Sequence, residues 1–334
     1  MEKIFQPIGQ RRLRTGTLVR ELVADVHLSH RAFIQPLFVE EGIEEKRTVE
    51  GLPGIYVFPA DEIAGEVTAC IANGIHKFLL FPIPAKKTAD QFDFTFATSV
   101  VRRLKAEFGD DIWLASDLCL CSYTTHGHCG ILDKDHTRLI NHLTVDVLTR
   151  YALQLAQAGA DCIAPSDMTD GRIGSIRAAL NAMGKEAVMI MSYAAKFSSQ
   201  WYGPFRDACH SGPGLLGFKG LKDRRTYQIS PNNGRDSLVS ALRDADEGAD
   251  ILMVKPATHY ADIIVRLADE VRKPIAAYHV SGEYAALESL VEKGLANRAL
   301  AHLEIWTALT RAGASIIISY AAKEAKEWIK SQEY

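Results

Sequence analysis

The amino-acid sequence predicts an α/β protein with the (β/α)8 barrel, or TIM-barrel, architecture. Eight short β-rich runs alternate with longer amphipathic stretches along the 334 residues, as in a chain of repeated βα units. Most of the runs are continuously apolar, as expected for strands covered by helices on both faces of a parallel sheet. Eight units in a chain of this length favour a closed barrel, and an open doubly wound sheet in two domains is the alternative.

The predicted strands are residues 34–39, 77–81, 112–117, 162–165, 187–193, 251–254, 275–280 and 315–320. Three helical stretches end in a similar phrase, AQAGAD, DEGAD or TRAGAS, immediately before a strand. The glycine of this phrase suits a left-handed helix terminus before a tight turn. The recurrence therefore supports a repeated unit in which helix, turn and strand follow one another.

The first residues do not join this pattern, so we divide the chain into an N-terminal arm, residues 1–30, and a barrel domain, residues 31–334. The arm carries charged residues and a short amphipathic helix within QRRLRTGTLVRELVADVHLSH. We expect this extension to pack on another subunit. A helix that covers the bottom of its own barrel is the alternative.

Composition favours small molecules as ligands. The 38 basic and 41 acidic residues give a net charge of −3 and are spread fairly evenly, which offers no electrostatic attraction for nucleic acid or an anionic membrane. No run approaches the roughly 18 to 20 apolar residues that span a bilayer, and the N-terminus lacks the apolar stretch of a signal peptide. We therefore expect a cytoplasmic protein with neither a membrane nor nucleic acid as a partner.

A cysteine-rich stretch, SDLCLCSYTTHGHCG at residues 116–130, holds three of the six cysteines and two histidines. A reducing compartment argues against disulfides, so Cys119, Cys121 and Cys129 are interpreted as metal ligands or reactive thiols. Three thiolates would leave the fourth position of a zinc ion open, which is typical of a catalytic site. A structural zinc site closed by a histidine of the same stretch, His126 or His128, is the alternative.

Polar residues gather where the predicted strands end. In such barrels the chemistry takes place at the carboxyl ends of the strands, in the mouth formed by the loops that follow them. The residues at these ends are Asp117, Ser166, Asp167, Lys196, Lys255, Ser281 and Tyr320. Two lysines therefore point at the same mouth.

Lys255 stands in the apolar context MVKP, which gives its ammonium group little water. Loss of hydration and a second nearby cation both lower the pKa of an amine, which makes a lysine nucleophilic toward a carbonyl carbon. Lys196 and Lys255 are thus candidates for Schiff-base formation. A lysine at the rim whose ammonium group reaches solvent is the alternative.

Several long blocks of the sequence are similar to one enzyme family. They are RRLR, SDLCLCSYTTHGHCG, IAPSDMTDGR, MSYAAKFSSQWYGPFRDA, DRRTYQ, LMVKPA, YHVSGEY and RAGASIIISY. Through these blocks, in order and over almost the whole length, the chain resembles the 5-aminolevulinate dehydratase, or porphobilinogen synthase, family.

The resemblance implies a TIM barrel with an N-terminal arm, assembled as a homo-octamer or, alternatively, a hexamer. It implies a lyase that condenses two 5-aminolevulinate molecules into porphobilinogen with loss of two waters, a step of heme and other tetrapyrrole biosynthesis. Lys255 would form a Schiff base with the first substrate, whose carboxylate would meet Ser281 and Tyr320. Lys196 would bind the second substrate in the same way, with Asp117 assisting proton transfer.

The resemblance also implies a site for the second substrate's carboxylate, made by Arg206, Arg224 and Gln228. Taken alone, each arginine would be interpreted as a solvated surface residue. The segment is rich in glycine and charge, so residues from about 197 to 227 are interpreted as an active-site lid. Further substrate-pocket positions, which ordinary core packing would also explain, are Phe81, Ser166, Tyr202, Phe205, Tyr278 and Val280.

The three cysteines indicate Zn²⁺ as the catalytic metal, since members of the family that use magnesium there replace the cysteines with carboxylates. Part of the family has a second, activating magnesium site that depends on a glutamate before the sixth strand. Ser240 stands at that place in this chain, with Arg243 close by, so we do not expect activation by Mg²⁺.

Two other functions fit part of the pattern. A lysine-dependent aldolase would share the barrel and one Schiff-base lysine, but it would need neither the second lysine nor the thiolate cluster. A zinc-binding scaffold or regulator would use the cluster structurally, and removal of the metal would then unfold the protein.

Overall fold

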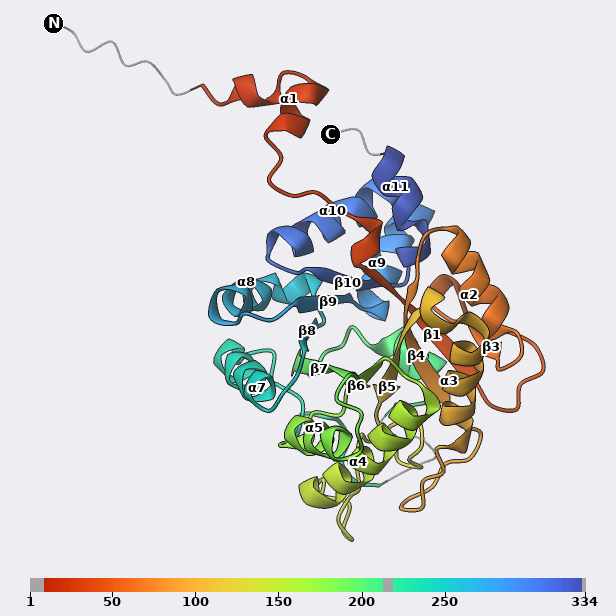
Figure 1. Cartoon of the computed structure of the whole chain (residues 1–334). Helices are drawn as coiled ribbons and strands as arrows, with labels where there is room; N and C mark the ends of the chain where they lie inside the picture. The colour runs from red at the N-terminus through yellow and green to blue at the C-terminus, as the bar shows by residue number, and fades with distance from the viewer. Residues whose placement is uncertain (1–8, 213–218, 332–334) are drawn as a thin grey trace, which may run out of the picture.

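The computed structural model describes residues 9–212 and 219–331 (Figure 1). Eight parallel strands form a closed barrel, namely β1 (Phe33–Glu40), β4 (Lys77–Ile83), β5 (Trp113–Leu118), β6 (Cys162–Pro165), β7 (Met189–Lys196), β8 (Ile251–Lys255), β9 (Ile275–His279) and β10 (Ile316–Ser319). β10 pairs with β1 through Ile317 and Phe33, and this pairing closes the barrel. The predicted TIM barrel is confirmed, with a strand in each of the eight predicted runs, and the open two-domain sheet is wrong.

Helices surround the barrel and cover its outer face (Figure 1). The helices of the described residues are α1 (Thr17–Leu22), which belongs to the N-terminal arm, and α2 (Ile63–Ala72), α3 (Thr95–Phe108), α4 (Asn141–Ala158), α5 (Arg172–Ala182), α6 (Gly203–Ala208), α7 (Gly234–Asp246), α8 (Ala261–Glu270), α9 (Ser281–Glu292), α10 (Arg298–Arg311) and α11 (Ala325–Ser331). In α4, Val147, Leu148, Tyr151 and Leu155 form one buried stripe. Burying an aliphatic side chain of this size contributes about 1.5–3 kcal/mol before the opposing entropy is counted. In the part of the chain that the structure describes, none of the helices has the length and apolar character needed to cross a membrane.

Glycines end several helices in the left-handed conformation that the repeated phrase predicts. Gly159, Gly248 and Gly313 have φ angles of 104°, 104° and 113°. At Gly313 an added β-carbon would lie 2.6 Å from the β-carbon of Ala268, so only glycine fits there. Short 3-10 segments complete the connections, namely η1 (Arg11–Arg14), η2 (His30–Ala32), η3 (Gly109–Asp111), η5 (Thr258–Tyr260) and η6 (Ala322–Glu324).

A hairpin that the sequence did not predict follows β1. It consists of β2 (Arg47–Val49) and β3 (Leu52–Pro59), which pair with each other in antiparallel fashion. β3 also lies parallel to the last residues of β1, Phe38 to Glu40. Because these residues are at the carboxyl end of β1, the hairpin lies at the mouth of the barrel.

The described part of the N-terminal arm extends away from the barrel (Figure 1). Neither η1 nor α1 has a buried residue. Leu18 and Leu22 are 80% and 83% exposed. The alternative of a helix that covers the bottom of its own barrel is therefore wrong. Residues 1–8 of the predicted arm lie outside the described residues.

Candidate active site

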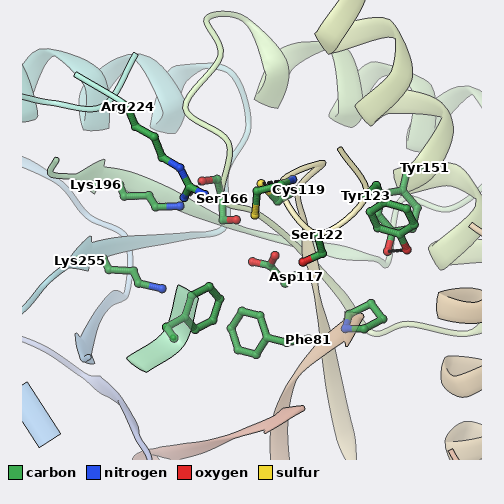
Figure 2. Close-up of a pocket in the computed structure, with 13 residues that line it drawn as sticks. Phe81, Asp117, Cys119, Ser122, Tyr123, Tyr151, Ser166, Lys196, Arg224 and Lys255 are labelled. Atoms are coloured by element: carbon green, nitrogen blue, oxygen red, sulfur yellow. Dashed lines mark hydrogen bonds between the residues drawn. The ribbon is translucent and has the colours of Figure 1, made fainter. Parts of the chain in front are cut away.

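Lys196 and Lys255 end the neighbouring strands β7 and β8 and are register partners in the ladder between them. Both side chains are buried, and both point into one pocket at the carboxyl end of the barrel (Figure 2). The prediction that two lysines share one mouth is therefore confirmed. The alternative of a rim lysine that reaches solvent is wrong for Lys255.

Aromatic rings enclose the amine of Lys255. Its Nζ atom lies 4.1 Å from the ring centre of Tyr278, 4.8 Å from that of Phe205 and 5.0 Å from that of Tyr193. Burial, and next the charge of Lys196, lower the pKa of Lys255 to about 7. Near neutral pH a substantial share of Lys255 is therefore the free amine, which is the form that attacks a carbonyl carbon.

Lys196 is held by backbone groups from both sides. Its Nζ donates a hydrogen bond to the carbonyl oxygen of Ser166, just beyond β6. Its own carbonyl oxygen accepts a hydrogen bond from the N–H of Ile229 at 3.1 Å. The Lys196 amine also lies 5.2 Å from the ring centre of Tyr193, so this one ring is close to both lysines.

Asp117 lies at the end of β5 and faces the same pocket (Figure 2). Its Oδ1 atom is buried and makes no hydrogen bond with any described residue. Loss of hydration, and next the nearby Cys121, raise the pKa of Asp117 to about 7, while both lysines oppose this increase. A carboxyl group between two amines is therefore positioned to exchange a proton with a group bound between them.

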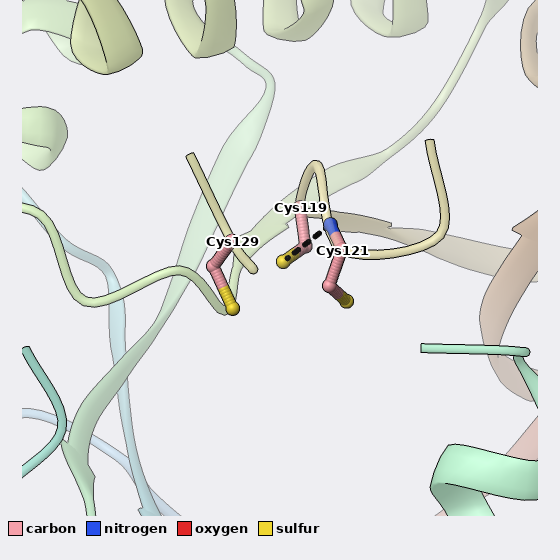
Figure 3. Close-up of side chains that lie close together, drawn as sticks. All are labelled: Cys119, Cys121 and Cys129. Carbon is pink, nitrogen blue, oxygen red and sulfur yellow. Dashed lines mark hydrogen bonds between the residues drawn. The ribbon is translucent and has the colours of Figure 1, made fainter. Parts of the chain in front are cut away.

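Three thiols converge in the loop that follows β5 (Figure 3). The Sγ atoms of Cys119, Cys121 and Cys129 all lie within 4.8 Å of one another, and all three residues are buried. Hydrogen bonds from the other two cysteines lower the pKa of Cys121 well below its ordinary value, whereas burial raises the pKa of Cys119 well above it. The cluster thus stabilises one thiolate by itself.

These thiols fit a divalent metal. Two sulfurs that bind one zinc ion at 2.3 Å with tetrahedral geometry lie about 3.8 Å apart, which the cluster can adopt with small shifts. A divalent cation would also allow the remaining two thiols to ionise. The buried cysteine cluster can therefore bind a metal ion.

The two histidines of the stretch are not part of this group. Among the described residues, the group of possible ligands contains only the three cysteines. The ring nitrogens of His128 lie 3.0 Å from the hydroxyl of Tyr227 and 2.8 Å from the carbonyl oxygen of Leu221. Nδ1 of His126 accepts a hydrogen bond from the N–H of His128. This arrangement favours three protein ligands and an open fourth position over a closed structural site.

Arg224 lines the same pocket, and a second arginine, Arg206, lies on α6. Arg224 is buried and donates hydrogen bonds to the carbonyl oxygens of Gly127, at 2.9 Å, and Ser211. Burial, and next the positive charge of Arg224, lower the pKa of Arg206. The Nε atoms of both arginines are buried without a hydrogen-bond partner among the described residues. An interpretation as a solvated surface residue is therefore wrong for Arg224, and the pair suits an anion.

Two phenols and a serine complete the surroundings: Tyr278 lies beside Lys255 and contacts Tyr320, and Ser281 contacts helix α6. The hydroxyl groups of Tyr278 and Tyr320 are 3.3 Å apart. The Oγ atom of Ser281 accepts a hydrogen bond from the N–H of Phe205 at 3.1 Å. The ring of Phe205 also meets that of Phe81 edge to face, with 5.0 Å between the ring centres.

The structure brings most of the predicted site residues together. The pocket is lined by the predicted residues Phe81, Asp117, Cys119, Cys121, Ser166, Lys196, Phe205, Arg224 and Lys255. The ring of Tyr202 lies 5.6 Å from Nζ of Lys255. Gln228 lines another pocket. Val280 is buried, and its backbone N–H donates a hydrogen bond to Oε2 of Glu283. The substrate contacts of all these residues stay predictions.

The predicted lid is described only in part, because residues 213–218 lie outside the described residues. Its first part contains α6, which carries Phe205 and Arg206. Its last part contains Arg224, whose side chain reaches into the pocket (Figure 2). The assignment of a lid stays a prediction.

Sequence reasoning missed Tyr193. Strand alternation places residues 193 and 196 on opposite faces, because their separation is odd. The ladder between β7 and β8, however, shifts register between Ser192 and Ala195, and this irregularity turns both side chains toward the pocket. Nothing in the segment MSYAAK marks the shift, so no sequence signal was available to find Tyr193.

A family model described as delta-aminolevulinic acid dehydratase matches residues 8–328 of the chain. The chain belongs to the delta-aminolevulinic acid dehydratase family. A relative of that name from Archaeoglobus fulgidus is 41% identical and aligns with 97% of this chain and 98% of its own length. One from Bacillus subtilis is 40% identical, with 96% and 97% covered.

A solved structure of the family agrees with the fold of this chain. The crystal structure of delta-aminolevulinic acid dehydratase (porphobilinogen synthase) from Toxoplasma gondii, in complex with the reaction product porphobilinogen, has a TM-score of 0.90 and is 36% identical. The match covers 97% of this chain and 92% of that one. The resemblance inferred from the sequence is therefore confirmed.

The surroundings of Ser240 bear on whether this chain has the second, activating magnesium site of part of the dehydratase family. Ser240 is buried, and its Oγ atom lies 3.4 Å from a guanidinium nitrogen of Arg243. Arg243 also forms ion pairs with Asp170, at 2.5 Å, and with Asp244, at 3.0 Å. The positively charged guanidinium group of Arg243 thus lies beside the carboxylates near Ser240.

Proposed function

We propose that this chain condenses two molecules of 5-aminolevulinate into porphobilinogen and two waters, as a lyase of heme and tetrapyrrole biosynthesis. The observation that carries the proposal is the pair of buried lysines beside three convergent thiols, in a chain of the dehydratase family. The relatives carry that enzyme's name, and the Toxoplasma gondii structure holds porphobilinogen as its reaction product.

The first substrate forms a Schiff base with Lys255. The free amine attacks the ketone carbon, and the ketone oxygen then leaves as water after proton transfer, which produces an iminium group. The positive charge of the iminium makes the protons on the adjacent carbon more acidic. Ser281 and Tyr320 hold the carboxylate of this substrate, and Phe81 and Phe205 exclude water from the reacting carbon.

The second substrate forms a Schiff base with Lys196. Arg206 and Arg224 bind its carboxylate, with Gln228 nearby, and an anion between the two guanidinium groups would remove their repulsion. Two substrates tethered to neighbouring strands react as an intramolecular pair. One carbon–carbon and one carbon–nitrogen bond form, the two ketone oxygens leave as two waters, and both lysines return as amines.

Cys119, Cys121 and Cys129 would hold Zn²⁺, which supplies polarisation of a carbonyl oxygen or an activated water at the second substrate. Asp117 exchanges protons with substrate atoms between the two lysines. We do not propose activation by Mg²⁺, because Ser240 cannot replace a glutamate ligand and Arg243 lies beside it.

The proposed function is tested by giving the purified protein 5-aminolevulinate and measuring porphobilinogen by its colour reaction. Product formation should be lost after treatment with a chelator and restored by zinc, and magnesium added to the zinc-loaded protein should leave the rate unchanged. Absence of product under every metal condition would overturn the proposal. A lysine-dependent aldolase would form a Schiff base without porphobilinogen, and a scaffold would bind zinc without turnover.

Adduct formation at Lys255 should depend on pH. Its pKa is lowered to about 7, so the amine is neutral above that pH and protonated below it. Only the neutral amine attacks a ketone, and the rate of borohydride-trapped adduct formation should therefore rise from pH 6 to pH 8 with a midpoint near 7. Lys196→Met removes the neighbouring cation and should move the midpoint upward. A rate that stays constant over this range would contradict the assignment.

We propose that the enzyme works in the cytoplasm as a homo-oligomer, an octamer or alternatively a hexamer, in which the N-terminal arm packs on another subunit. The exposed leucines of the arm support this proposal, since Leu18 and Leu22 contact nothing in their own barrel that buries them. Deletion of residues 1–25 should leave a folded barrel in a smaller assembly. Size-exclusion chromatography with light scattering measures the change, and an unchanged mass would contradict the role of the arm.

A further inference from the structure

Four side chains from separate parts of the chain meet at the end of helix α6. We name them the α6 clamp, and they are Glu40 from the end of β1, Arg47 from β2, Lys87 from the loop after β4, and His210 just after α6. None of them was singled out by the sequence, and none lines the pocket described above.

Arg47 is the central member of the α6 clamp. Its Nε donates a hydrogen bond to Oε2 of Glu40 at 2.8 Å, and its Nη2 donates to the carbonyl oxygen of Ala208 at 2.9 Å. Ala208 is the last residue of α6, and helix ends leave carbonyl oxygens without an intrahelical partner. A guanidinium group is well suited to this position, because it meets a carboxylate and a carbonyl oxygen at once with a fixed geometry.

Glu40 and Lys87 both contact His210, the residue two positions after the end of α6. Nε2 of His210 lies 3.1 Å from Oε1 of Glu40, and Nζ of Lys87 donates a hydrogen bond to the carbonyl oxygen of His210 at 2.8 Å. The same Lys87 donates to the carbonyl oxygen of Ser122, next to the cysteine cluster, also at 2.8 Å. His210 has a φ angle of 46°, which residues with a β-carbon rarely adopt, so surrounding contacts are needed to fix it.

The hairpin that supplies Arg47 also supports the beginning of α6. Gly51 in its turn lies so close that an added β-carbon would be 3.3 Å from Cγ of Pro204. Pro204 lies in the first turn of α6. The hairpin of β2 and β3 therefore contacts both ends of this short helix.

The segment fixed in this way carries the groups proposed to bind substrate. Phe205 and Arg206 belong to α6 itself. The N–H of Ser211 donates to the carbonyl oxygen of Arg206 at 3.0 Å, and the carbonyl oxygen of Ser211 accepts a hydrogen bond from Arg224. The α6 clamp is thus joined through hydrogen bonds and one turn of backbone to both arginines.

We propose that Arg47 is a positioning residue for the second substrate, which acts through the α6 clamp to hold Arg206 and Arg224 at the distance that a carboxylate needs. This inference rests on the proposed function, since it assigns the clamp to the carboxylate subsite of that reaction. Loss of the Arg47 contacts would release the end of α6 without removing a group that touches substrate. Binding of the second substrate should suffer more than the chemical step.

Kinetics of Arg47→Ala test this proposal. The KM for 5-aminolevulinate should rise about tenfold, while kcat should stay within about threefold of the original value. Arg103→Ala is the matched control, because Arg103 donates to the carbonyl oxygens of Ala60 and Asp61 in another turn, away from the pocket. The double variant Arg47→Ala/Arg206→Ala should bind substrate only slightly less well than Arg206→Ala, because both changes affect one subsite. An unchanged KM in Arg47→Ala, or fully additive effects in the double variant, would overturn the proposal.

Hydrogen exchange separates the clamp from the proposed function. Amides of residues 205–211 should exchange faster in Arg47→Ala than in the original protein or in Arg103→Ala, because the end of α6 opens more often. If the amides of residues 205–211 exchange at an unchanged rate in Arg47→Ala, the role of the α6 clamp is overturned, whether or not the enzyme is active. If the original protein shows no turnover, the proposed function is overturned. Faster exchange in Arg47→Ala would in that case still show that Arg47 holds α6. If Arg47→Ala does not fold, Glu40→Gln removes the charged partner of Arg47 and takes its place.

Discussion

Lys255→Ala is expected to abolish the borohydride-trapped adduct at the first substrate position and to lower turnover by about three orders of magnitude or more. The amine of Lys255 has no substitute, because its neighbour Lys196 is held by the carbonyl oxygen of Ser166, just beyond β6. Without the iminium group, the first substrate is neither tethered nor activated. Mass spectrometry of the reduced protein after incubation with 5-aminolevulinate measures the adduct, and porphobilinogen formation measures turnover.

Two controls make this result specific. Lys77→Ala removes another partly buried lysine of a barrel strand, but Lys77 begins β4 at the far end of the barrel and should not matter for turnover. Lys255→Met keeps most of the side-chain volume within the aromatic enclosure, so a shared loss in both Lys255 variants cannot arise from a cavity. If the original protein instead forms a single adduct on Lys196 alone, the first substrate is not bound by Lys255.

The fold could be predicted because each barrel strand is an apolar run between amphipathic helices. The hairpin could not, because LPGIYVFP in β3 has only part of its length buried and carries proline and glycine near its start, which indicate a turn. Its pairing with β1 is a tertiary contact at Phe38 to Glu40, apart from the residues that pair with β10 and close the barrel. Local pattern therefore identified the repeated units and missed the element added to them.

The candidate site was predicted to the extent that its residues lie at strand ends or in a dense cluster. Lys255 and the three cysteines have unusual local contexts, so their chemistry is visible in the sequence. Tyr193 depends on a register shift, and Arg47 acquires its partner Ala208 only after folding, 161 residues further along the chain. Arg224 resembles a surface residue in sequence, because only the tertiary structure shows that it is buried.

Cys121→Ala is expected to remove bound zinc and to lower turnover by about two to three orders of magnitude. Hydrogen bonds from Cys119 and Cys129 lower the pKa of Cys121, whereas the pKa values of those two cysteines are raised, so Cys121 is the member that the other two thiols favour as a thiolate. Its loss would leave only Cys119 and Cys129, too few protein ligands for a tight site. Metal analysis of the purified variant and the porphobilinogen assay measure the two effects. Cys70→Ala is the control, since Cys70 is a buried thiol of α2 outside the cluster.

The fold of the same variant decides between a catalytic and a structural metal. Most of the buried core is made by the barrel strands and the helices around them, and the three cysteines form a group separate from it, so Cys121→Ala should keep the circular dichroism spectrum and most of the thermal stability of the original protein. A structural zinc would instead be needed for folding, and the variant would then unfold or melt far below Cys70→Ala. A folded variant that contains no zinc and still forms porphobilinogen at the original rate would show that the cluster has no part in catalysis. A folded, zinc-free and inactive variant would place the metal in the reaction, because only its chemistry would have been removed.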